Sequence, residues 1–362
     1  MLEDRSIVTF INLMLHGLMR VKCFNVEGKM TKQLKIFFAC DVHGSTTCFK
    51  KYLNALQVYK ADIGILSGDL CGKFVVPIVL RSDGSYECTY IGERIVTKNE
   101  ERLKEIERKF ETMGAYYAYL TEEDFKELLE EGKTIEGRID EKVKGVTLSS
   151  GKTEKLFEEK VVERLCKWLD YANDYLKRIG RRIYITPGND DLLIIDDIIK
   201  RYESEHIIFA DLTVNDIGGY EMASLSWSNP TPWDTPRETN EDHLRKMISN
   251  LLQKVTNMET AIFQFHVPPK DTLLDQAPKL DEKLRPSVDH TVGVGSIVVR
   301  EAIERYQPLL GLHGHIHESR GIQKLGRTYI LNPGSEYTEG ILKGVMVALE
   351  KGRFKAYQFT SG

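Results

Sequence analysis

Five short apolar runs, spread along the sequence and each followed closely by polar or glycine residues, most strongly constrain how this chain can fold. Short runs bounded by turn residues are typical of strands buried on both faces of a sheet. Segments with helical periodicity lie between them, and this alternation predicts an α/β sheet. The predicted strands are Ile36–Cys40, Ile63–Ser67, Ile183–Thr186, Ala261–Phe265 and Leu309–Leu312. The predicted helices are Thr47–Gln57, Leu192–Tyr202, Glu241–Thr256 and Ser296–Tyr306.

The pattern changes after His317, where apolar runs are separated by Gly, Asn and Pro instead of by helical segments. Short strands with such turn residues between them favour antiparallel pairing. The sequence therefore predicts an antiparallel finish to the fold. Its strands are Ile322–Leu325, Thr328–Leu331, Val345–Leu349 and Phe354–Phe359.

The stretch 73–180 supplies no candidate site residue, and we interpret it as a large, mainly helical insertion that begins with a hairpin. The hairpin, residues 74–96, is centred on Ser82-Asp83-Gly84. Apolar stripes at helical spacing then predict amphipathic helices, and the last of them ends at Gly180. Thr121-x-x-Asp124 is typical of a capping box. The charged positions favour a solvated helix surface, with a lid over the site or a dimer contact as alternatives.

Composition limits the class of protein. The 362 residues are 41% hydrophobic and 29% charged, so the chain can bury a substantial core. We predict an N-terminal extension at 1–33 and one domain at 34–362, interrupted by 73–180. The formal net charge of -4 provides no global basic field for nucleic acid, although it leaves a local basic groove open. The six cysteines include no CxxC pair, which favours reduced, intracellular thiols.

The N-terminal segment does not resemble a membrane anchor or a secretory signal. Ile7–Leu18 is apolar but is interrupted by polar residues, and it is too short to span a bilayer comfortably. The residues before it, MLEDRS, are acidic rather than basic. We therefore expect a cytoplasmic protein with no membrane partner.

Polar side chains suited to metal ligation follow the five predicted strands. Loops at the carboxyl ends of strands in an open α/β sheet meet in one crevice, so residues far apart in sequence can converge there. Each motif alone is more often an ordinary turn or a hydrogen-bonded histidine, and their joint occurrence carries the prediction. The candidate residues are Asp41, His43, Asp69, Asn189, Asp190, His266, His315 and His317.

Seven of these residues, all except Asp190, form a ligand set of oxygens and imidazoles without a thiolate. Such a set favours manganese, and also suits iron, zinc or nickel, better than a cysteine zinc site or an all-oxygen magnesium site. Seven ligands would overfill one zinc ion, whereas two metal ions ~3.5–4 Å apart that share a carboxylate would use them all. The sequence therefore predicts two divalent transition metal ions.

The ordered series D-x-H, GD, GN[D/H], H and GHxH resembles the calcineurin-like metallophosphoesterase family, and is closest to uncharacterised prokaryotic phosphodiesterase-like members. The resemblance covers about Leu34 to Ser335 apart from the insertion, and the turn Asn332-Pro333-Gly334-Ser335 is similar to a recurring element of the family. It implies a metallophosphoesterase-type β-sandwich of mixed sheets flanked by helices. It further implies two metal ions that share Asp69. The implied ligands are Asp41, His43, Asp69 and His317 for the first ion, and Asp69, Asn189, His266 and His315 for the second.

The expected reaction is hydrolysis of a phosphate ester by a hydroxide that bridges the two ions. Asn189 would also orient the substrate. The sequence departs from the family at Asp190, where many members carry a histidine that acts as an acid. An ordinary aspartate is ionised at neutral pH and is a poor proton donor, so Asp190 is expected to position water or a histidine. We therefore predict a preference for phosphodiesters or activated leaving groups over alkyl monoesters.

Two other functions remain open from the sequence. Binuclear amidohydrolases acting on C–N bonds use clustered His and Asp, but their His-x-His usually comes on the first strand, whereas here it comes last. A non-catalytic metal-binding interaction scaffold of the same fold is the second alternative, although none of the seven ligands is missing. The predicted partner is a phosphate-ester substrate. Nucleic acid is not indicated, and homo-oligomerisation is open.

Overall fold

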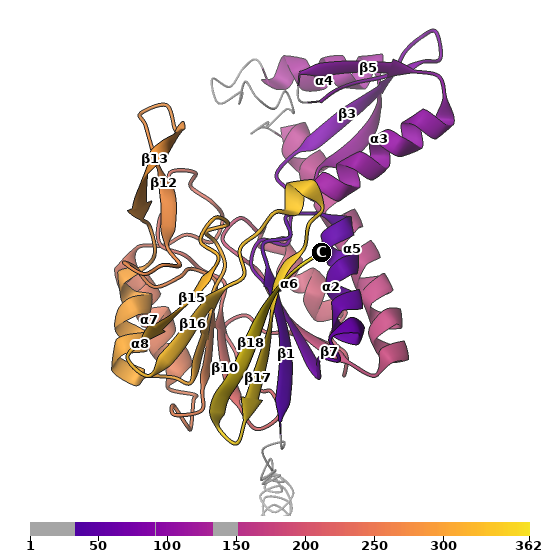
Figure 1. Cartoon of the computed structure of the whole chain (residues 1–362). Coiled ribbons are helices and arrows are strands. Elements are labelled where there is room, and N and C mark those ends of the chain that lie inside the picture. The colour runs from indigo at the N-terminus through magenta and orange to yellow at the C-terminus, as the bar shows by residue number, and fades with distance from the viewer. Residues whose placement is uncertain (1–32, 91, 133–150) are drawn as a thin grey trace, which may run out of the picture.

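The computed structural model describes residues 33–90, 92–132 and 151–362 (Figure 1). The predicted extension at 1–33, with its apolar segment Ile7–Leu18, therefore lies outside the described residues except at Gln33. Of the helices within the described residues, none combines the length and hydropathy that crossing a bilayer requires.

The first of the two large sheets contains three of the predicted strands in its centre. Its six strands have the order β18-β17-β1-β2-β7-β8. β1, β2, β7 and β8 run parallel, while β17 and β18 complete the other edge with antiparallel pairing. The strands are β1 (Leu34–Cys40), β2 (Ile63–Ser67), β7 (Arg182–Thr186), β8 (Ile207–Phe209), β17 (Lys343–Glu350) and β18 (Arg353–Ser361).

The second sheet contains the other two of the five strands predicted before His317, and its six strands have the order β15-β16-β14-β11-β10-β9. β10, β11, β14 and β16 run parallel, and the edge strands β9 and β15 are antiparallel to their neighbours. The predicted antiparallel finish is thus confirmed for the pairs β15–β16 and β17–β18. The strands are β9 (Val214–Asp216), β10 (Glu221–Leu225), β11 (Ile262–Phe265), β14 (Leu310–Leu312), β15 (Gly321–Leu325) and β16 (Thr328–Asn332).

The two sheets pack face to face, and helices cover their outer faces (Figure 1). Side chains alternate along β1 as a strand requires: Phe37 faces the helices, and Phe38 faces the second sheet. Both faces of the central strands are therefore buried, which explains their continuous apolar runs. The predicted mixed-sheet sandwich flanked by helices is confirmed. The helices are α2 (Thr46–Val58), α5 (Gly151–Ile179) and α6 (Ile194–Arg201) on the first sheet, and α7 (Glu241–Leu252) and α8 (Ile297–Tyr306) on the second.

The insertion contains more strand structure than the sequence predicts, because a four-stranded sheet accompanies its helices. The sheet order is β5-β4-β3-β6, with β3 parallel to β6. The predicted turn at Ser82-Asp83-Gly84 does join β3 to β4, and the predicted capping box forms, since the Asp124 amide donates to Thr121 Oγ1 (3.1 Å). Its elements are β3 (Val75–Leu80), β4 (Tyr86–Tyr90), β5 (Glu93–Thr97), α3 (Glu100–Met113), β6 (Tyr116–Thr121) and α4 (Glu122–Gly132).

Helix α5 packs on the main body although it falls within 73–180. Trp168 stacks on Phe49 of α2 with ring centroids 4.4 Å apart, and its indole nitrogen donates to Thr46 Oγ1 (3.0 Å). The apolar stripe that predicts α5 therefore covers the first sheet. The division of the chain into domains at residues 73 and 180 remains a prediction.

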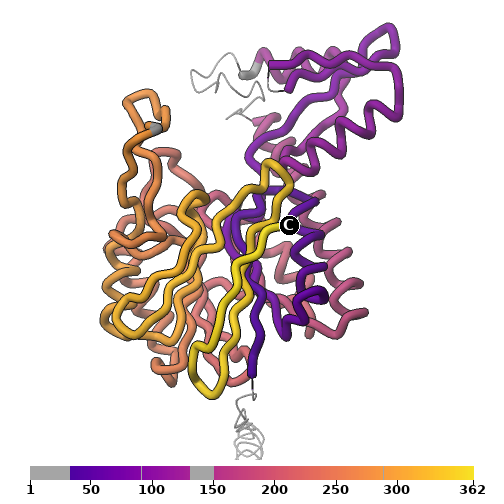
Figure 2. The backbone as a smooth tube through the Cα atoms, viewed as in Figure 1, coloured from indigo at the N-terminus to yellow at the C-terminus, as the bar shows by residue number. Residues whose placement is uncertain are grey.

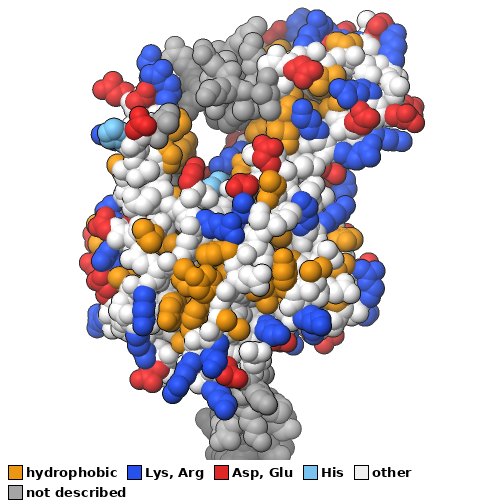
Figure 3. Space-filling model, viewed as in Figure 1, with side chains coloured by type: hydrophobic (Ala, Val, Ile, Leu, Met, Phe, Trp, Pro, Cys, Tyr) orange, Lys and Arg blue, Asp and Glu red, His pale blue; other side chains and the backbone are white. Residues whose placement is uncertain are grey.

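The four-stranded sheet of the insertion, with α3 and α4, projects beyond one end of the two large sheets (Figures 1 and 2). A hairpin formed by β12 (Gln276–Leu280) and β13 (Pro286–Gly293) projects beyond the same end. This is the end at which β1 terminates. Figure 3 shows histidine, acidic and basic side chains exposed together in the hollow between the two projections. The predicted site residues follow strands that end here.

Candidate metal centre

Asp41 and His43 lie on the short loop that joins β1 to α2. Both are fully buried and have positive φ angles of 53° and 39°, which is uncommon for residues other than glycine and costs backbone strain. The His43 amide donates to the Asp69 carbonyl oxygen (2.8 Å), and the His315 amide donates to Asp41 Oδ2 (3.0 Å). The loop is thereby held to strand ends of both sheets.

Gly68 allows the loop after β2 to approach the His266 ring. Its φ is +75°, and a Cβ placed there would lie 2.2 Å from His266 Nδ1, so a larger residue would displace the ring. The next residue, Asp69, is buried, and its Oδ1 accepts the Asp190 amide (2.9 Å). This bond joins the loop after β2 to the loop after β7.

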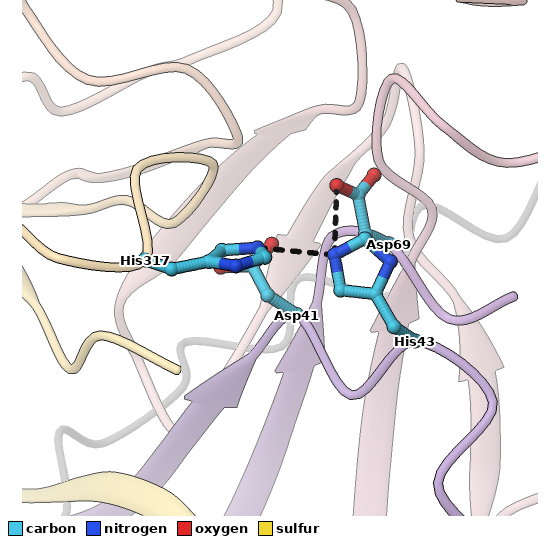
Figure 4. Close-up of side chains that lie close together, drawn as sticks. All are labelled: Asp41, His43, Asp69 and His317. Carbon is cyan, nitrogen blue, oxygen red and sulfur yellow. Dashed lines mark hydrogen bonds and ion pairs between the residues drawn. The ribbon is translucent and has the colours of Figure 1, made fainter. Parts of the chain in front are cut away.

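The first group of candidate ligands consists of Asp41, His43, Asp69 and His317 (Figure 4). One ligand atom from each lies within 4.8 Å of the others. His43 Nε2 is 3.5 Å from Asp69 Oδ2 and 3.0 Å from His317 Nε2. Two ring nitrogens this close can share one proton or bind one cation.

The second group consists of Asp69, His266 and His315 and meets the first at Asp69. His266 Nε2 lies 3.6 Å from Asp69 Oδ1. Asn189 completes this group, since its Oδ1 lies 2.8 Å from His266 Nε2 and 2.7 Å from His315 Nδ1. The fold thus brings all seven predicted ligands together in two adjoining groups, although they come from loops after β1, β2, β7, β11 and β14.

Burial favours the neutral forms of these groups. Burial, followed by the nearby carboxylates of Asp190 and Asp41, raises the pKa of Asp69 well above its ordinary value, and burial raises the pKa of Asp41 to about 7. Burial also lowers the pKa of His315 to about 4 and that of His317 to about 3. A neutral imidazole offers a lone pair to a metal, and a cation would offset the cost of burying two carboxylates.

The donor set fits a metal ion at the first group. Asp41 Oδ1 is fully buried and has no hydrogen-bond partner within the described residues. Such an oxygen is costly when ionised unless a positive charge lies beside it. A cation held by Asp41, His43, Asp69 and His317 would supply that charge.

Asp191 ties the two central loops of the first sheet together. Its carboxylate is fully buried and accepts from the amides of Leu70 (3.0 Å), Cys71 (2.7 Å) and Gly188 (2.8 Å). The sequence-based prediction assigns no role to this residue. The structure shows instead that it holds the loop bearing Asp69 against the loop bearing Asn189.

The orientation of the Asn189 amide is fixed by Thr235 and Glu238. Glu238 accepts from the Thr231 amide (2.7 Å) and the Thr235 amide (3.1 Å), and the Thr235 hydroxyl donates to the same carboxylate. Having used its proton there, the hydroxyl accepts from Asn189 Nδ2 (2.8 Å). The amide oxygen of Asn189 must then face His266 and His315.

Asp190, the residue that departs from the family pattern, pairs with Lys73. Lys73 Nζ lies 2.8 Å from Asp190 Oδ2, and the same oxygen is 3.9 Å from His43 Nδ1. Although desolvation opposes its charge, the carboxylates of Asp190 and Asp69, together with Tyr337, raise the pKa of Lys73 above its ordinary value. The sequence-based prediction did not include Lys73. No spacing pattern in the sequence marks it, because its partner Asp190 lies on a distant loop.

Comparisons with known proteins support the fold. No family model matches the chain. The uncharacterized protein MJ1162 of Methanocaldococcus jannaschii is 28% identical over 175 residues, which are 48% of this chain and 69% of that protein. One solved crystal structure shares the fold at a TM-score of 0.50 with 15% identity, covering 91% of this chain and 98% of its own.

Two further solved structures are less similar. TT1561 of Thermus thermophilus has a TM-score of 0.46 and 14% identity, over 91% of this chain and 98% of that one. A novel phosphatase from Mycoplasma pneumoniae has a TM-score of 0.36 and 12% identity, over 91% and 93% of the two chains.

Other residues near the site have structural roles. His313 is fully buried, and its Nδ1 lies 2.8 Å from the Phe265 carbonyl oxygen, outside both ligand groups. Asn332, the last residue of β16 and the first of the predicted turn, donates from Nδ2 to the carbonyl oxygens of Gly314 (3.2 Å) and Ile316 (2.9 Å). This turn therefore positions the loop that carries His315 and His317.

Proposed function

We propose that this protein is a metal-dependent phosphoesterase of the calcineurin-like metallophosphoesterase family. The observation that carries the proposal is the meeting of the seven side chains in two groups that share Asp69. The order of the motifs along the chain supports the family, and the absence of thiolates from the ligand set supports manganese or a similar transition metal. We place the protein in the cytoplasm.

The ligands are divided as the family resemblance implies. Asp41, His43, Asp69 and His317 hold one ion, and Asp69, Asn189, His266 and His315 hold the other. The two ions, when bound, supply a hydroxide nucleophile at neutral pH and neutralise phosphate oxygens. Asn189 also orients the substrate, and Asp190 acts through Lys73 and His43 without donating a proton.

The preferred substrate is a phosphodiester or another ester with an activated leaving group. Asp190 is engaged with the Lys73 ammonium at 2.8 Å, so it is unsuited to protonating an alkoxide as that group departs. Alkyl monoesters need such a proton, whereas a good leaving group does not. The pair Lys73–Asp190 thus supports the preference that the sequence predicts.

The test is reconstitution of the purified protein with manganese, followed by metal analysis and rate measurements on a diester and a monoester. We expect two bound ions per chain and faster turnover of the diester. Two bound ions with no turnover would favour the interaction scaffold, and faster turnover of simple alkyl monoesters would contradict the diester preference.

The orientation of the Asn189 amide gives a prediction about the second ion. Replacing Thr235→Val removes the hydroxyl that accepts from Asn189 Nδ2 but keeps the shape of the side chain, so the amide is free to turn its nitrogen towards the metal. We expect the affinity for the second ion to fall roughly 10–100-fold, as when other residues that hydrogen-bond to a metal ligand are replaced. Manganese titration with a count of bound ions measures this, and Thr235→Ser, which keeps the hydroxyl, is the matched control. Equal affinities in both variants would show that Thr235 does not orient the amide.

A further inference from the structure

Lys73 places a positive charge at the edge of the candidate metal centre. It follows the loop of Asp69, and Asp190, its partner, also donates its backbone amide to Asp69 Oδ1 (2.9 Å). The ammonium is therefore linked to Asp69, the residue shared by the two ligand groups, through Asp190. About half of the Lys73 side-chain surface (48%) is exposed to solvent. An ammonium carries three N–H donors, and the contact with Asp190 uses one of them.

Arg237, another cation near the site, is placed differently. Arg237 is 1% exposed, and its guanidinium donates to the Asp191 carbonyl oxygen (3.0 Å) and to the carboxylate of Asp196. It stabilises the loop after β7 from the protein interior, and its burial keeps it from contacting a ligand bound in the hollow. Lys73 is thus better placed than Arg237 to meet an anion.

We propose that Lys73 contacts the leaving oxygen of the substrate and stabilises its negative charge, and that Asp190 is a positioning residue that holds the ammonium in place. This inference rests on the proposed phosphoesterase function and specifies its substrate class. The favoured substrates are those whose leaving group departs as a stable anion. In biological molecules this describes a phosphate released from a phosphoanhydride bond, and in the laboratory an aryl phosphodiester.

The hydrolysis does not require a general acid to protonate the leaving oxygen. The oxygen of water bonds to phosphorus, one of its protons stays on the product phosphate, and the other goes to solvent. The bond between phosphorus and the leaving oxygen breaks, and that oxygen keeps the electron pair and departs as an anion beside Lys73. A fixed positive charge stabilises this developing anion in the transition state more than in the ground state.

The experiment compares wild-type protein, Lys73→Met, Lys73→Arg and Lys160→Met, all loaded with manganese and analysed for metal content and thermal unfolding. The substrates are aryl phosphodiesters whose leaving phenols differ in acidity. Imidodiphosphate, an analogue of pyrophosphate in which nitrogen replaces the bridging oxygen and resists hydrolysis, is titrated as an anion probe by calorimetry. Lys160 is the matched control because its Nζ lies 2.8 Å from Glu163 on α5, outside the site.

We expect Lys73→Met to lose about 100-fold in kcat/KM for the least acidic phenol, as when one oxyanion donor is removed, and much less for the most acidic one. Its imidodiphosphate affinity should fall at least tenfold with metal content unchanged, while Lys73→Arg recovers most of both and Lys160→Met matches wild type. A Lys73→Met protein with the wild-type dependence on leaving-group acidity and wild-type imidodiphosphate affinity would overturn this inference alone. A metal-loaded wild-type protein that hydrolyses none of the esters would overturn the proposed function instead.

Discussion

Asp69→Asn is expected to abolish turnover and to remove at least one of the two proposed metal ions while the fold stays intact. Asp69 is the residue shared by the two ligand groups. An amide lacks the negative charge and the second anionic oxygen that allow a carboxylate to serve two ions. Since loss of an outer-shell partner alone typically costs 10–100-fold in metal affinity, we expect a loss of more than about 100-fold here.

The stability of the metal-free proteins separates a ligand role from a structural one. In the absence of metal, burial raises the pKa of Asp69, which means that the folded state disfavours its charge. Asn removes that charge, and its oxygen can still accept the Asp190 amide, so metal-free Asp69→Asn should unfold at or above the wild-type temperature. The control is Asp62→Asn, at the exposed amino end of β2, where the Lys35 amide donates to the carboxylate (2.8 Å). Retained metal and turnover in Asp69→Asn would refute its bridging role.

Asp191→Ala should cause the largest loss of stability among single changes near the site, about 3–5 kcal/mol. The carboxylate accepts from three backbone amides at 2.7–3.0 Å, and alanine would leave those amides without an acceptor in the interior. Each unsatisfied buried group costs roughly 1–3 kcal/mol, and partial relaxation or water entry reduces the sum. Urea unfolding measures the loss, and we expect metal affinity to fall with it because the loops of Asp69 and Asn189 separate.

The comparison with an exposed carboxylate tests this explanation. Asp174 lies on the exposed face of α5, and Asp174→Ala should change the free energy of unfolding by no more than about 0.5 kcal/mol. Asp191→Asn keeps one acceptor oxygen and should fall between the two. If Asp191→Ala were as stable as Asp174→Ala, the carboxylate would not be what holds the loops together.

The strands and the ligands were accessible from the sequence because both leave local patterns. β2 and its neighbouring strands appear in the sequence as apolar runs, and the residues that follow them are of types that bind metals. The strands of the insertion were harder to predict from the sequence. β6 carries the sequence Tyr-Tyr-Ala-Tyr-Leu-Thr, which has no clear contrast between its two faces, and its parallel partner β3 lies far away in the chain. A strand defined by distant pairing has little local signature.

The supporting residues of the site had no local signature either. Thr235 and Glu238 matter because their loop returns to Asn189, and Lys73 matters because its ammonium meets Asp190 from another loop. Neither contact can be predicted from the spacing of residues along the chain. Asp191 could be identified as a polar turn residue, but the three amides that it joins come from two different loops.

The sequence by itself determined the α/β class, the buried strands and the seven candidate ligands, because apolar runs and ligand chemistry are properties of short segments. The sandwich of two mixed sheets was implied only by the resemblance to a known family. Only the tertiary structure decided which way the Asn189 amide faces, which partner Asp190 has, and that α5 covers the first sheet. These features depend on distances between side chains that the chain brings together from far apart, and such distances exist only after the sheets have packed.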